Sequence, residues 1–328
     1  GPAEGGLLAE WIDGVCDLLA LPVFMDGKVN EFAVMCVRAD PTPMDEHRLG
    51  GGVGSVNLMA RCYETLAVKN EIEQLHARLD AQIAEIGRVQ RSLLPASWPT
   101  DPRLSVAASY QPSEAAGGDY YDYRAFPNPA GAGDDLFGLV IADVSGHGPV
   151  ASVAMAILRT AMHATTKNDR PPEFTVPDVN ELLYEILEPG TFITAFLVTI
   201  DPQTGACVYA SCGHNPPRLR RASGTIEILN QNGSPPLGLL PELKGAGDSF
   251  TMNPGDTLVL YTDGITEAFS PTGELFGEDR LDKAIASAGD DPQSVIDAVL
   301  RAVADHAGDR KQEDDQTLVV LRYNGSEA

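Results

Sequence analysis

The chain has 328 residues, enough for about two domains and a substantial buried core. Its 47 Asp and Glu residues outnumber 23 Lys and Arg residues, which gives a formal net charge of −24. Because nucleic acids and anionic membranes attract clustered Lys and Arg, so acidic a chain is expected to bind neither.

The five cysteines form no CxxC pair and are odd in number. This pattern argues against a disulfide framework or a thiolate zinc site and favours a reducing, cytoplasmic location. No apolar run approaches the roughly 18 residues needed to cross a bilayer, so we expect no membrane segment within this chain.

Residues 1–55 mix short apolar runs with turns. We expect strands at 21–24 and 31–38, joined by a turn at 25–28, and then a loop with several prolines and the glycines at 50–52. The glycines could suggest a phosphate-binding loop, but no Lys-Ser or Lys-Thr follows them, so a flexible turn is the simpler interpretation. About 50 residues with so few strands make a poor independent domain, and the segment is interpreted as an α/β fragment.

Residues 56–95 are predicted to form one long linker helix. Apolar residues recur there at steps of three and four, at Val68, Ile72, Leu75, Leu79, Ile86, Val89 and Leu93. Only Gln82 interrupts this heptad seam. Such a seam is typical of a coiled coil that joins two chains into a homodimer, in which the two helices are either parallel or antiparallel. The alternative is one amphipathic helix lying on its own domain. Pro95 and Pro99 end the helix.

Residues 96–328 have the pattern of an α+β domain. Strands are expected at 104–110, 120–126, 136–142, 192–200, 206–211, 225–229, 257–261 and 316–322. Helices are expected at 150–165, 179–187, 278–288 and 292–307. Strand pairs followed by helix pairs favour two stacked antiparallel sheets flanked by helices over a doubly wound parallel sheet. The arginines at 218, 220 and 221 are expected on a solvated strand.

Two pairs of aspartates stand at strand ends. Asp119 and Asp143 are symmetric about Gly131, in the middle of a stretch with hairpin chemistry, so an antiparallel hairpin places them side by side. Asp263 follows the strand 257–261, and Asp314 and Asp315 precede the strand 316–322. If those strands are antiparallel neighbours, this second set also meets at one end.

Carboxylates at strand ends, without a His or Cys ligand cluster, are the ligands of hard cations such as Mg²⁺ or Mn²⁺. Two such ions about 3.5–4 Å apart can share a hydroxide and hold a phosphate, so a phosphoester can be hydrolysed without a protein nucleophile. Any one of these aspartates alone could instead be a turn former. The ordered set favours the metal centre.

A resemblance becomes specific in the motifs GGDYYD, ADVSGHG, GTFITAFLVTID, ASCGHNPP, PLGLL, LVLYTDGITEA and DDQTLVV, in this order. They resemble the SpoIIE/RsbU-type serine phosphatases, the bacterial branch of the metal-dependent PPM (protein phosphatase 2C-like) family. The resemblance covers about residues 88–323. It implies an αββα sandwich with two Mn²⁺ or Mg²⁺ ions between the sheets.

The resemblance assigns the metal ligands and catalytic carboxylates. Asp119 and Asp143 would serve the metals, with Asp143 bridging both. The backbone carbonyl of Val144 would be a further ligand, and Asp263 and Asp314 would complete the second site. The supporting residues would be Gly118, Asp122, His147 and Asp315.

Among the supporting residues, Asp122 could also serve a third, weaker metal. His147 could donate a proton to the leaving alkoxide, although a structural role is the simpler interpretation, and His214 more simply orders a turn. No arginine is an obvious match for the phosphate-clamping arginine of eukaryotic relatives, and Arg103 is only a candidate.

The segment before the phosphatase-like region resembles, over a short stretch, the C-terminal part of a GAF sensor domain. The organisation expected is therefore 1–55 sensor fragment, 56–95 coiled-coil linker and 96–328 phosphatase domain. The resemblance also implies that the linker signals to the segment after Asp143. If this hypothesis is correct, changing Leu75 and Leu79 to Glu uncouples the coiled coil and makes activity independent of dimerisation. A variant with unchanged mass in solution and unchanged activity would contradict the hypothesis.

The resemblance favours a metal-dependent phosphatase acting on phosphoserine or phosphothreonine. The implied substrate is a STAS-domain anti-anti-sigma factor in a partner-switching pathway. One alternative is a non-enzymatic or gated scaffold that binds the same partner. Another is a hydrolase of small phosphoesters or nucleotides.

Overall fold

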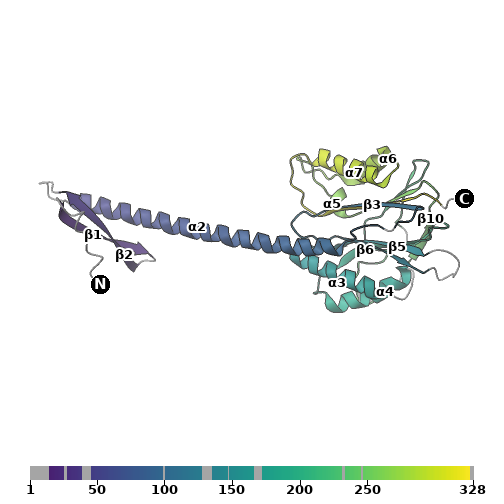
Figure 1. The fold of residues 1–328 in the computed structure, drawn as a ribbon, viewed down its shortest axis with the longest axis horizontal. Helices are drawn as coiled ribbons and strands as arrows, with labels where there is room; N and C mark the ends of the chain where they lie inside the picture. The colour runs from purple at the N-terminus through teal and green to yellow at the C-terminus, as the bar shows by residue number, and fades with distance from the viewer. Residues whose placement is uncertain are drawn as a thin grey trace. The chain divides into compact units, whose positions relative to one another are not determined.

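The computed structural model describes residues 15–25, 28–38, 46–98, 100–127, 135–146, 148–165, 172–230, 233–244 and 247–325 (Figure 1). The chain divides into two compact units, residues 1–79 and 80–328, with the boundary inside helix α2 (Glu46–Leu93). The glycine-rich tip of the predicted hairpin and His147 lie outside the described residues. In the described residues no helix is both long and apolar enough to span a membrane.

The first unit contains an antiparallel hairpin and the first part of α2. Strands β1 (Val15–Met25) and β2 (Lys28–Arg38) confirm the predicted strands and extend them. Helix α2 begins at Glu46, so the predicted loop is wrong from residue 46 onward. Each glycine there costs helix propensity of about 1 kcal/mol, but extending an existing helix avoids the cost of nucleation. The GAF resemblance of this unit stays a prediction.

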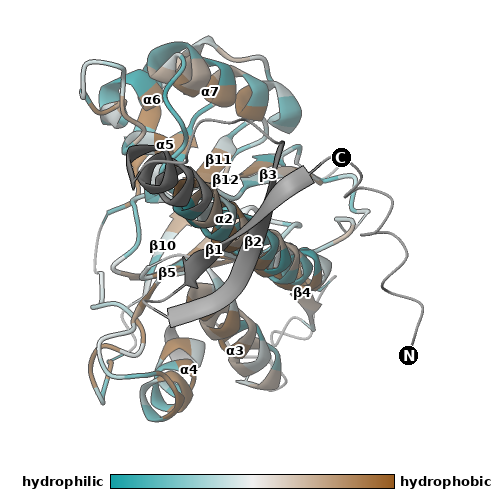
Figure 2. Ribbon diagram, turned by 90° about the vertical axis from the view of Figure 1, so that its left-hand side faces the viewer, coloured by the Kyte–Doolittle hydropathy of each residue, from teal (hydrophilic) through white to brown (hydrophobic). Residues whose placement is uncertain are grey.

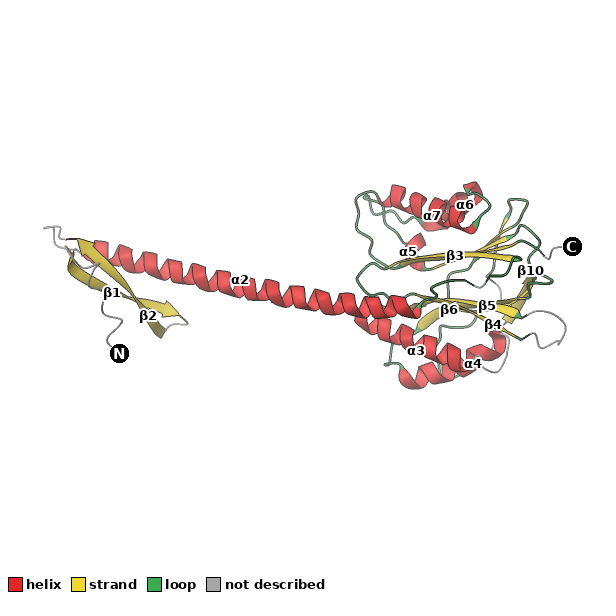
Figure 3. Cartoon of the chain, viewed as in Figure 1, coloured by secondary structure: helices red, strands yellow, loops and turns green. Residues whose placement is uncertain are grey.

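The second unit is an αββα sandwich, which confirms the predicted fold class (Figure 3). In its described part, one five-stranded antiparallel sheet has the order β10-β7-β6-β5-β4 and the other has the order β3-β12-β11-β8-β9. The first sheet consists of β4 (Tyr120–Phe126), β5 (Leu136–Val144), β6 (Ile193–Ile200), β7 (Ala206–Cys212) and β10 (Gly247–Thr251). The second consists of β3 (Leu104–Gln111), β8 (Arg218–Arg220), β9 (Ile226–Ile228), β11 (Thr257–Tyr261) and β12 (Gln316–Tyr323).

Two helix pairs cover the outer faces of the sheets (Figure 2). Helices α3 (Pro149–Thr165) and α4 (Pro172–Ile186) pack on the first sheet, and α6 (Gly277–Ser287) and α7 (Pro292–Ala307) pack on the second. A third apolar layer lies between the sheets. Strand β11 is buried at every position because it is central and covered on both faces. The short elements β10 and α5 (Asp263–Thr266) are absent from the sequence prediction.

The arginines of strand β8 correct another expectation, because they are not solvated. Arg218 is fully buried and contacts Glu278 and Asp282 of helix α6, each at 2.8 Å. Arg220 donates to backbone carbonyls at the end of the same helix. These contacts tie α6 to its sheet.

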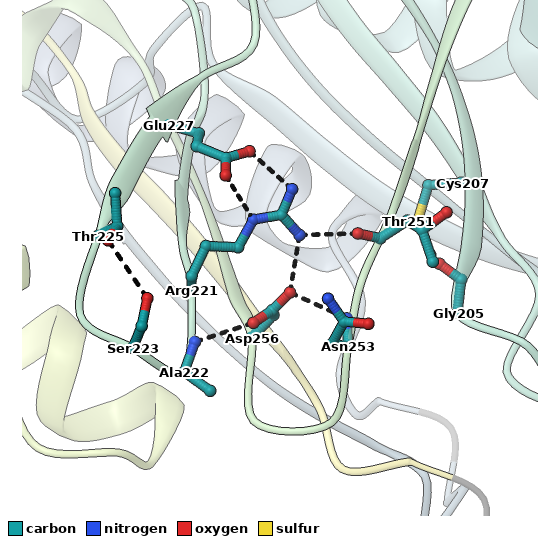
Figure 4. Close-up of polar contacts among 10 residues, drawn as sticks. All are labelled: Gly205, Cys207, Arg221, Ala222, Ser223, Thr225, Glu227, Thr251, Asn253 and Asp256. Carbon is teal, nitrogen blue, oxygen red and sulfur yellow. Dashed lines mark hydrogen bonds and ion pairs between the residues drawn. The ribbon is translucent and has the colours of Figure 1, made fainter.

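Arg221, just after β8, lies in a separate polar network (Figure 4). It donates to Glu227, Asp256 and the backbone carbonyl of Thr251. The arginine cluster therefore holds the second sheet together rather than forming a free basic surface.

Candidate metal centre

The hairpin of β4 and β5 brings Asp119 beside Asp143. Tyr120 pairs with Ala142, so the same register carries Asp119, one residue before β4, opposite Asp143 near the end of β5. Asp143 is among the charges that raise the pKa of Asp119, which places the two carboxylates close together. The predicted symmetry of the hairpin is therefore confirmed.

The second pair forms at the end of β11 and the start of β12. These strands are antiparallel neighbours, as the sequence prediction required, and Tyr261 pairs with Leu318. A Cβ at Gly264 would lie 2.0 Å from the carbonyl oxygen of Asp315, so only glycine allows α5 to pack this closely on the following segment. This close contact holds Asp263, at the start of α5, near Asp314.

The two pairs face each other across the sandwich. Burial, followed by the charges of Asp263 and Asp314, raises the pKa of Asp143 to about 8. Burial and the charge of Asp314 raise the pKa of Asp263 to about 6. Asp119 is fully buried, and burial together with Asp143 raises its pKa well above the usual range. Four carboxylates from two sheets therefore share one acidic site.

Two threonines that the sequence prediction missed hold Asp119 in place. Oδ2 of Asp119 accepts hydrogen bonds from Thr262 Oγ1 at 2.8 Å and from Thr317 Oγ1. Both threonines are buried on the side of the opposite sheet; Thr262 directly precedes Asp263, and Thr317 follows Asp315 by two residues. Their β-branched side chains read as ordinary strand residues in the sequence, and only the packing of the two sheets shows their partner.

The Asp315 side chain binds the backbone before Asp119 rather than pointing to solvent. It accepts hydrogen bonds from Ser113 N at 2.8 Å and from Gly118 N at 2.6 Å, and it is 3% exposed. Asp314, by contrast, is exposed. A Cβ at Gly118 would lie 2.9 Å from the carbonyl oxygen of Val144, so this glycine brings the Asp119 segment against the expected carbonyl ligand.

Two of the candidate residues lie elsewhere, and a third is not described. Asp122 accepts hydrogen bonds from Tyr120 Oη and pairs with His163 Nε2, each at 2.8 Å, on the α3 side of its sheet, so its expected supporting role is not met by its contacts. Arg103 binds Asp101 just before β3. It is at the wrong end to clamp phosphate, because the other end of β3, at Gln111, lies beside Gln316 and the acidic site. His147 lies outside the described residues.

His214 is a buried, neutral residue behind the acidic site. Its Nδ1 lies 2.9 Å from Thr194 Oγ1, and Thr194 is paired with Asp143 in the β5–β6 register. Burial lowers the pKa of His214 to about 4. The expectation that it orders the local structure agrees with these contacts.

The last turns of α2 contact the segment that leads to Asp119, which the sequence did not indicate. Gln90 is 3% exposed; its Nε2 donates to Gly117 O at 2.7 Å, and its Oε1 accepts from Gly117 N at 3.0 Å. Ser152 of α3 also donates to Gly117 O, at 3.0 Å. A Cβ at Gly87 would lie 1.7 Å from Ala115 O, so a side chain at position 87 would prevent this contact. Gly87, the only glycine in the predicted helix 56–95, is therefore the one feature of the sequence that could have indicated the close packing.

The donor set fits a hard divalent cation. The four carboxylates and the Val144 carbonyl supply only oxygen ligands, which Mg²⁺ and Mn²⁺ prefer. Within the described ranges, no three His, Cys, Asp or Glu side chains are already drawn together as a metal site. Burial raises the pKa of Asp143 and of Asp263, and repulsion by the neighbouring carboxylates raises both further.

The αββα sandwich with this acidic edge defines the protein phosphatase 2C class of fold. The sequence model of the family described as Stage II sporulation protein E (SpoIIE) matches residues 133–324, which is more than half of the chain. The chain therefore belongs to the SpoIIE family, and the resemblance stated from the motifs is confirmed.

Curated relatives agree with this assignment. Protein IcfG of Synechocystis sp. is 27% identical over 290 residues, which cover 78% of this chain and 45% of IcfG. Phosphoserine phosphatase RsbU of Bacillus subtilis is 26% identical over 254 residues, which cover 76% of this chain and 72% of RsbU. The chain thus spans less than half the length of one relative and about three quarters of the other.

A solved structure shows the same fold. The SiaA-PP2C domain of Pseudomonas aeruginosa superposes with a TM-score of 0.63 at 20% identity, covering 76% of this chain and 98% of that domain. The agreement concerns the arrangement of the two sheets and their helices.

Proposed function

We propose that the chain is a metal-dependent protein phosphatase that hydrolyses phosphoserine or phosphothreonine. The observation that carries this proposal is the meeting of Asp119, Asp143, Asp263 and Asp314 between two sheets, where burial and mutual repulsion raise carboxylate pKa values. The phosphoserine phosphatase activity named for RsbU supports the same reaction class.

Asp119, Asp143 and the Val144 carbonyl would hold one side of a two-ion centre, and Asp263 and Asp314 the other. Two Mn²⁺ or Mg²⁺ ions would supply a water nucleophile and charge neutralisation for the phosphoryl group. The contacts of these residues support the proposal. Thr262 and Thr317 orient Asp119, and Asp315 holds the Gly118 backbone against the Val144 carbonyl. The negatively charged and polar oxygen atoms of the site are thus held in position before the substrate binds.

The substrate we propose is a serine-phosphorylated STAS-domain regulator of the anti-anti-sigma class, in a partner-switching pathway. The membership of the SpoIIE family and the similarity to RsbU support this choice. An acidic chain that meets another protein, rather than nucleic acid, is consistent with its net charge of −24.

The same proposal includes a cytoplasmic homodimer with three segments, 1–55, 56–95 and 96–328. The support for dimerisation is the apolar seam of α2, where Ile72, Leu75 and Leu79 are 48–55% exposed. Apolar side chains repeated every three to four residues and left in solvent are typical of a coiled-coil face.

Rates on three kinds of substrate test the proposal. The purified chain with Mn²⁺ should release phosphate from a serine-phosphorylated STAS-domain protein much faster than from a nucleotide monophosphate. Faster nucleotide hydrolysis would favour the small-phosphoester alternative. Binding of the STAS-domain protein without any phosphate release, also in an assay with an aryl phosphate, would favour the scaffold.

A further inference from the structure

A groove of about 440 Å³ opens beside the acidic site, between α5, the C-terminal half of α7 and the segment 308–316. Its apolar lining includes Phe269, Leu300 and Ala304. The volume lies within the range of roughly 300–1,000 Å³ that is usual for ligand pockets. None of the residues proposed to hold metal forms this apolar part.

The groove is continuous with the candidate metal centre. Gly264 and Asp314 line it, and Gly264 packs against the backbone of Asp314 and Asp315. Whatever is attached to a phosphoryl group bound at the carboxylates therefore has this groove as a neighbouring surface. In a phosphoprotein, that attached group is the polypeptide on either side of the phosphorylated residue.

The groove wall is held in place by its own contacts. Gln312 Nε2 donates to Gln111 O and to Asp314 O, both at 2.7 Å. The Arg310 guanidinium lies 4.7 Å from the centre of the Phe269 ring and pairs with Glu313 at 2.7 Å. Because this wall is already ordered, it loses little conformational entropy when a peptide binds.

The charges along the groove are unequal. Arg310 is engaged by Glu313, whereas Lys311 is exposed and has no partner among the described residues. Glu267 also lines the groove and lies near Asp263, whose pKa its charge helps to raise. Lys311 therefore favours an acidic side chain on the occupant.

We propose that this groove receives the polypeptide segment flanking the phosphorylated residue, with an apolar side chain on Ala304 and Phe269 and an acidic side chain at Lys311. Main-chain contacts with pockets for particular side chains are a common mode of peptide recognition. The inference rests on the proposed phosphatase function and specifies how that site selects its substrate.

Three variants test the groove. Ala304 is exposed on α7, so Ala304→Gln fills the apolar part without removing core packing. Lys311→Glu reverses the free charge. Lys283→Glu is the matched control, because Lys283 is equally exposed but lies on α6, outside the groove.

The 328-residue chain and each variant of it are incubated with Mn²⁺ and a degenerate library of phosphoserine peptides, and the dephosphorylated sequences are identified by mass spectrometry. Rates on para-nitrophenyl phosphate, which has no peptide, are measured in parallel and used to normalise the peptide rates. The unaltered chain should prefer an apolar and an acidic residue at fixed positions near the phosphoserine. Ala304→Gln should reduce the apolar preference at least tenfold, and Lys311→Glu should change the acidic preference to a basic one.

Lys283→Glu should keep the preferences of the unaltered chain. A peptide preference that is absent in the unaltered chain, or unchanged in both groove variants, would overturn the groove as the docking site while leaving the phosphatase proposal intact. No turnover of para-nitrophenyl phosphate by the unaltered chain would overturn the proposed function itself, and this inference with it.

Discussion

Asp119 is the most constrained of the four carboxylates. It is fully buried, lies beside Asp143, and receives hydroxyl hydrogen bonds from Thr262 and Thr317 of the facing sheet. Hydrogen bonds to a carboxylate stabilise its charged form, which opposes the effect of burial. The threonines therefore keep Asp119 oriented for the ligand role proposed for it.

Thr317→Val is expected to weaken Mn²⁺-dependent phosphatase activity without unfolding the chain. It removes one charge-assisted hydrogen bond while keeping a β-branched side chain in β12, at a cost of about 1.5–3 kcal/mol. A Mn²⁺ titration of aryl phosphate turnover should show a half-saturating concentration raised at least tenfold. Thr317→Ser keeps the hydroxyl and should stay near the unaltered value; equal behaviour of the Val and Ser variants would contradict the role given to the hydroxyl.

His214 makes stability depend on pH. Its pKa is about 4 in the folded chain against 6.5 as a free side chain, so the unfolded state binds more protons between these values. Its contribution is complete above pH 6.5 and is lost as the pH falls toward 4, about 2 kcal/mol between pH 7 and pH 5. In urea unfolding of the metal-free chain, His214→Asn should lose less stability than the unaltered chain over this interval. Parallel pH profiles would show that His214 is not buried in its neutral form.

The sequence predicted the aspartate pairs because strand register can be deduced from a hairpin and from motif order. It could not predict Thr262, Thr317 or Gln90, since their roles depend on which sheet and which helix face each other. Asp122 was drawn into the prediction by its closeness in sequence to Asp119. Side chains alternate between the two faces along a strand, however, so Asp122, three positions after Asp119, lies on the opposite face and binds His163 instead.

Among the elements, the end of α2 contacts the segment that leads to Asp119. Gln90 closes two hydrogen bonds with the backbone of Gly117, and Ser152 of α3 adds a third. Gly87 allows the approach, because the Ala115 carbonyl occupies the space that a side chain would need. The last turns of α2 thus belong structurally to the sandwich, although the sequence predicts a linker that continues to residue 95.

Gly87→Ala is expected to destabilise the sandwich and reduce turnover. In an ordinary helix this change stabilises by about 1 kcal/mol, whereas here the added Cβ would lie 1.7 Å from Ala115 O. Displacing the backbone should cost about 1–3 kcal/mol and separate Gln90 from Gly117. Urea unfolding and Mn²⁺-dependent turnover report the two effects; a gain in stability would show that α2 does not pack on this segment.

At the scale of the whole molecule, the sandwich could be predicted well because its strands alternate with turn signals and its motifs keep their order. The boundaries of β4, β11 and α7 agree with the sequence prediction to the residue. Short elements such as β10 and α5 could not be predicted, because tertiary packing rather than local propensity determines them. The glycines at 50–52 misled the prediction for the same reason, since the helix into which they fold continues far beyond them.

The central claim is that four carboxylates between two sheets form a metal-dependent phosphatase centre. Its most direct test is phosphate release from para-nitrophenyl phosphate by the full chain, titrated with Mn²⁺ and compared with EDTA and with Asp263→Asn. We expect turnover that rises with Mn²⁺, stops with EDTA and falls at least a hundredfold in the variant. Turnover that persists in EDTA or in Asp263→Asn, or no turnover at any Mn²⁺ concentration, would contradict this account.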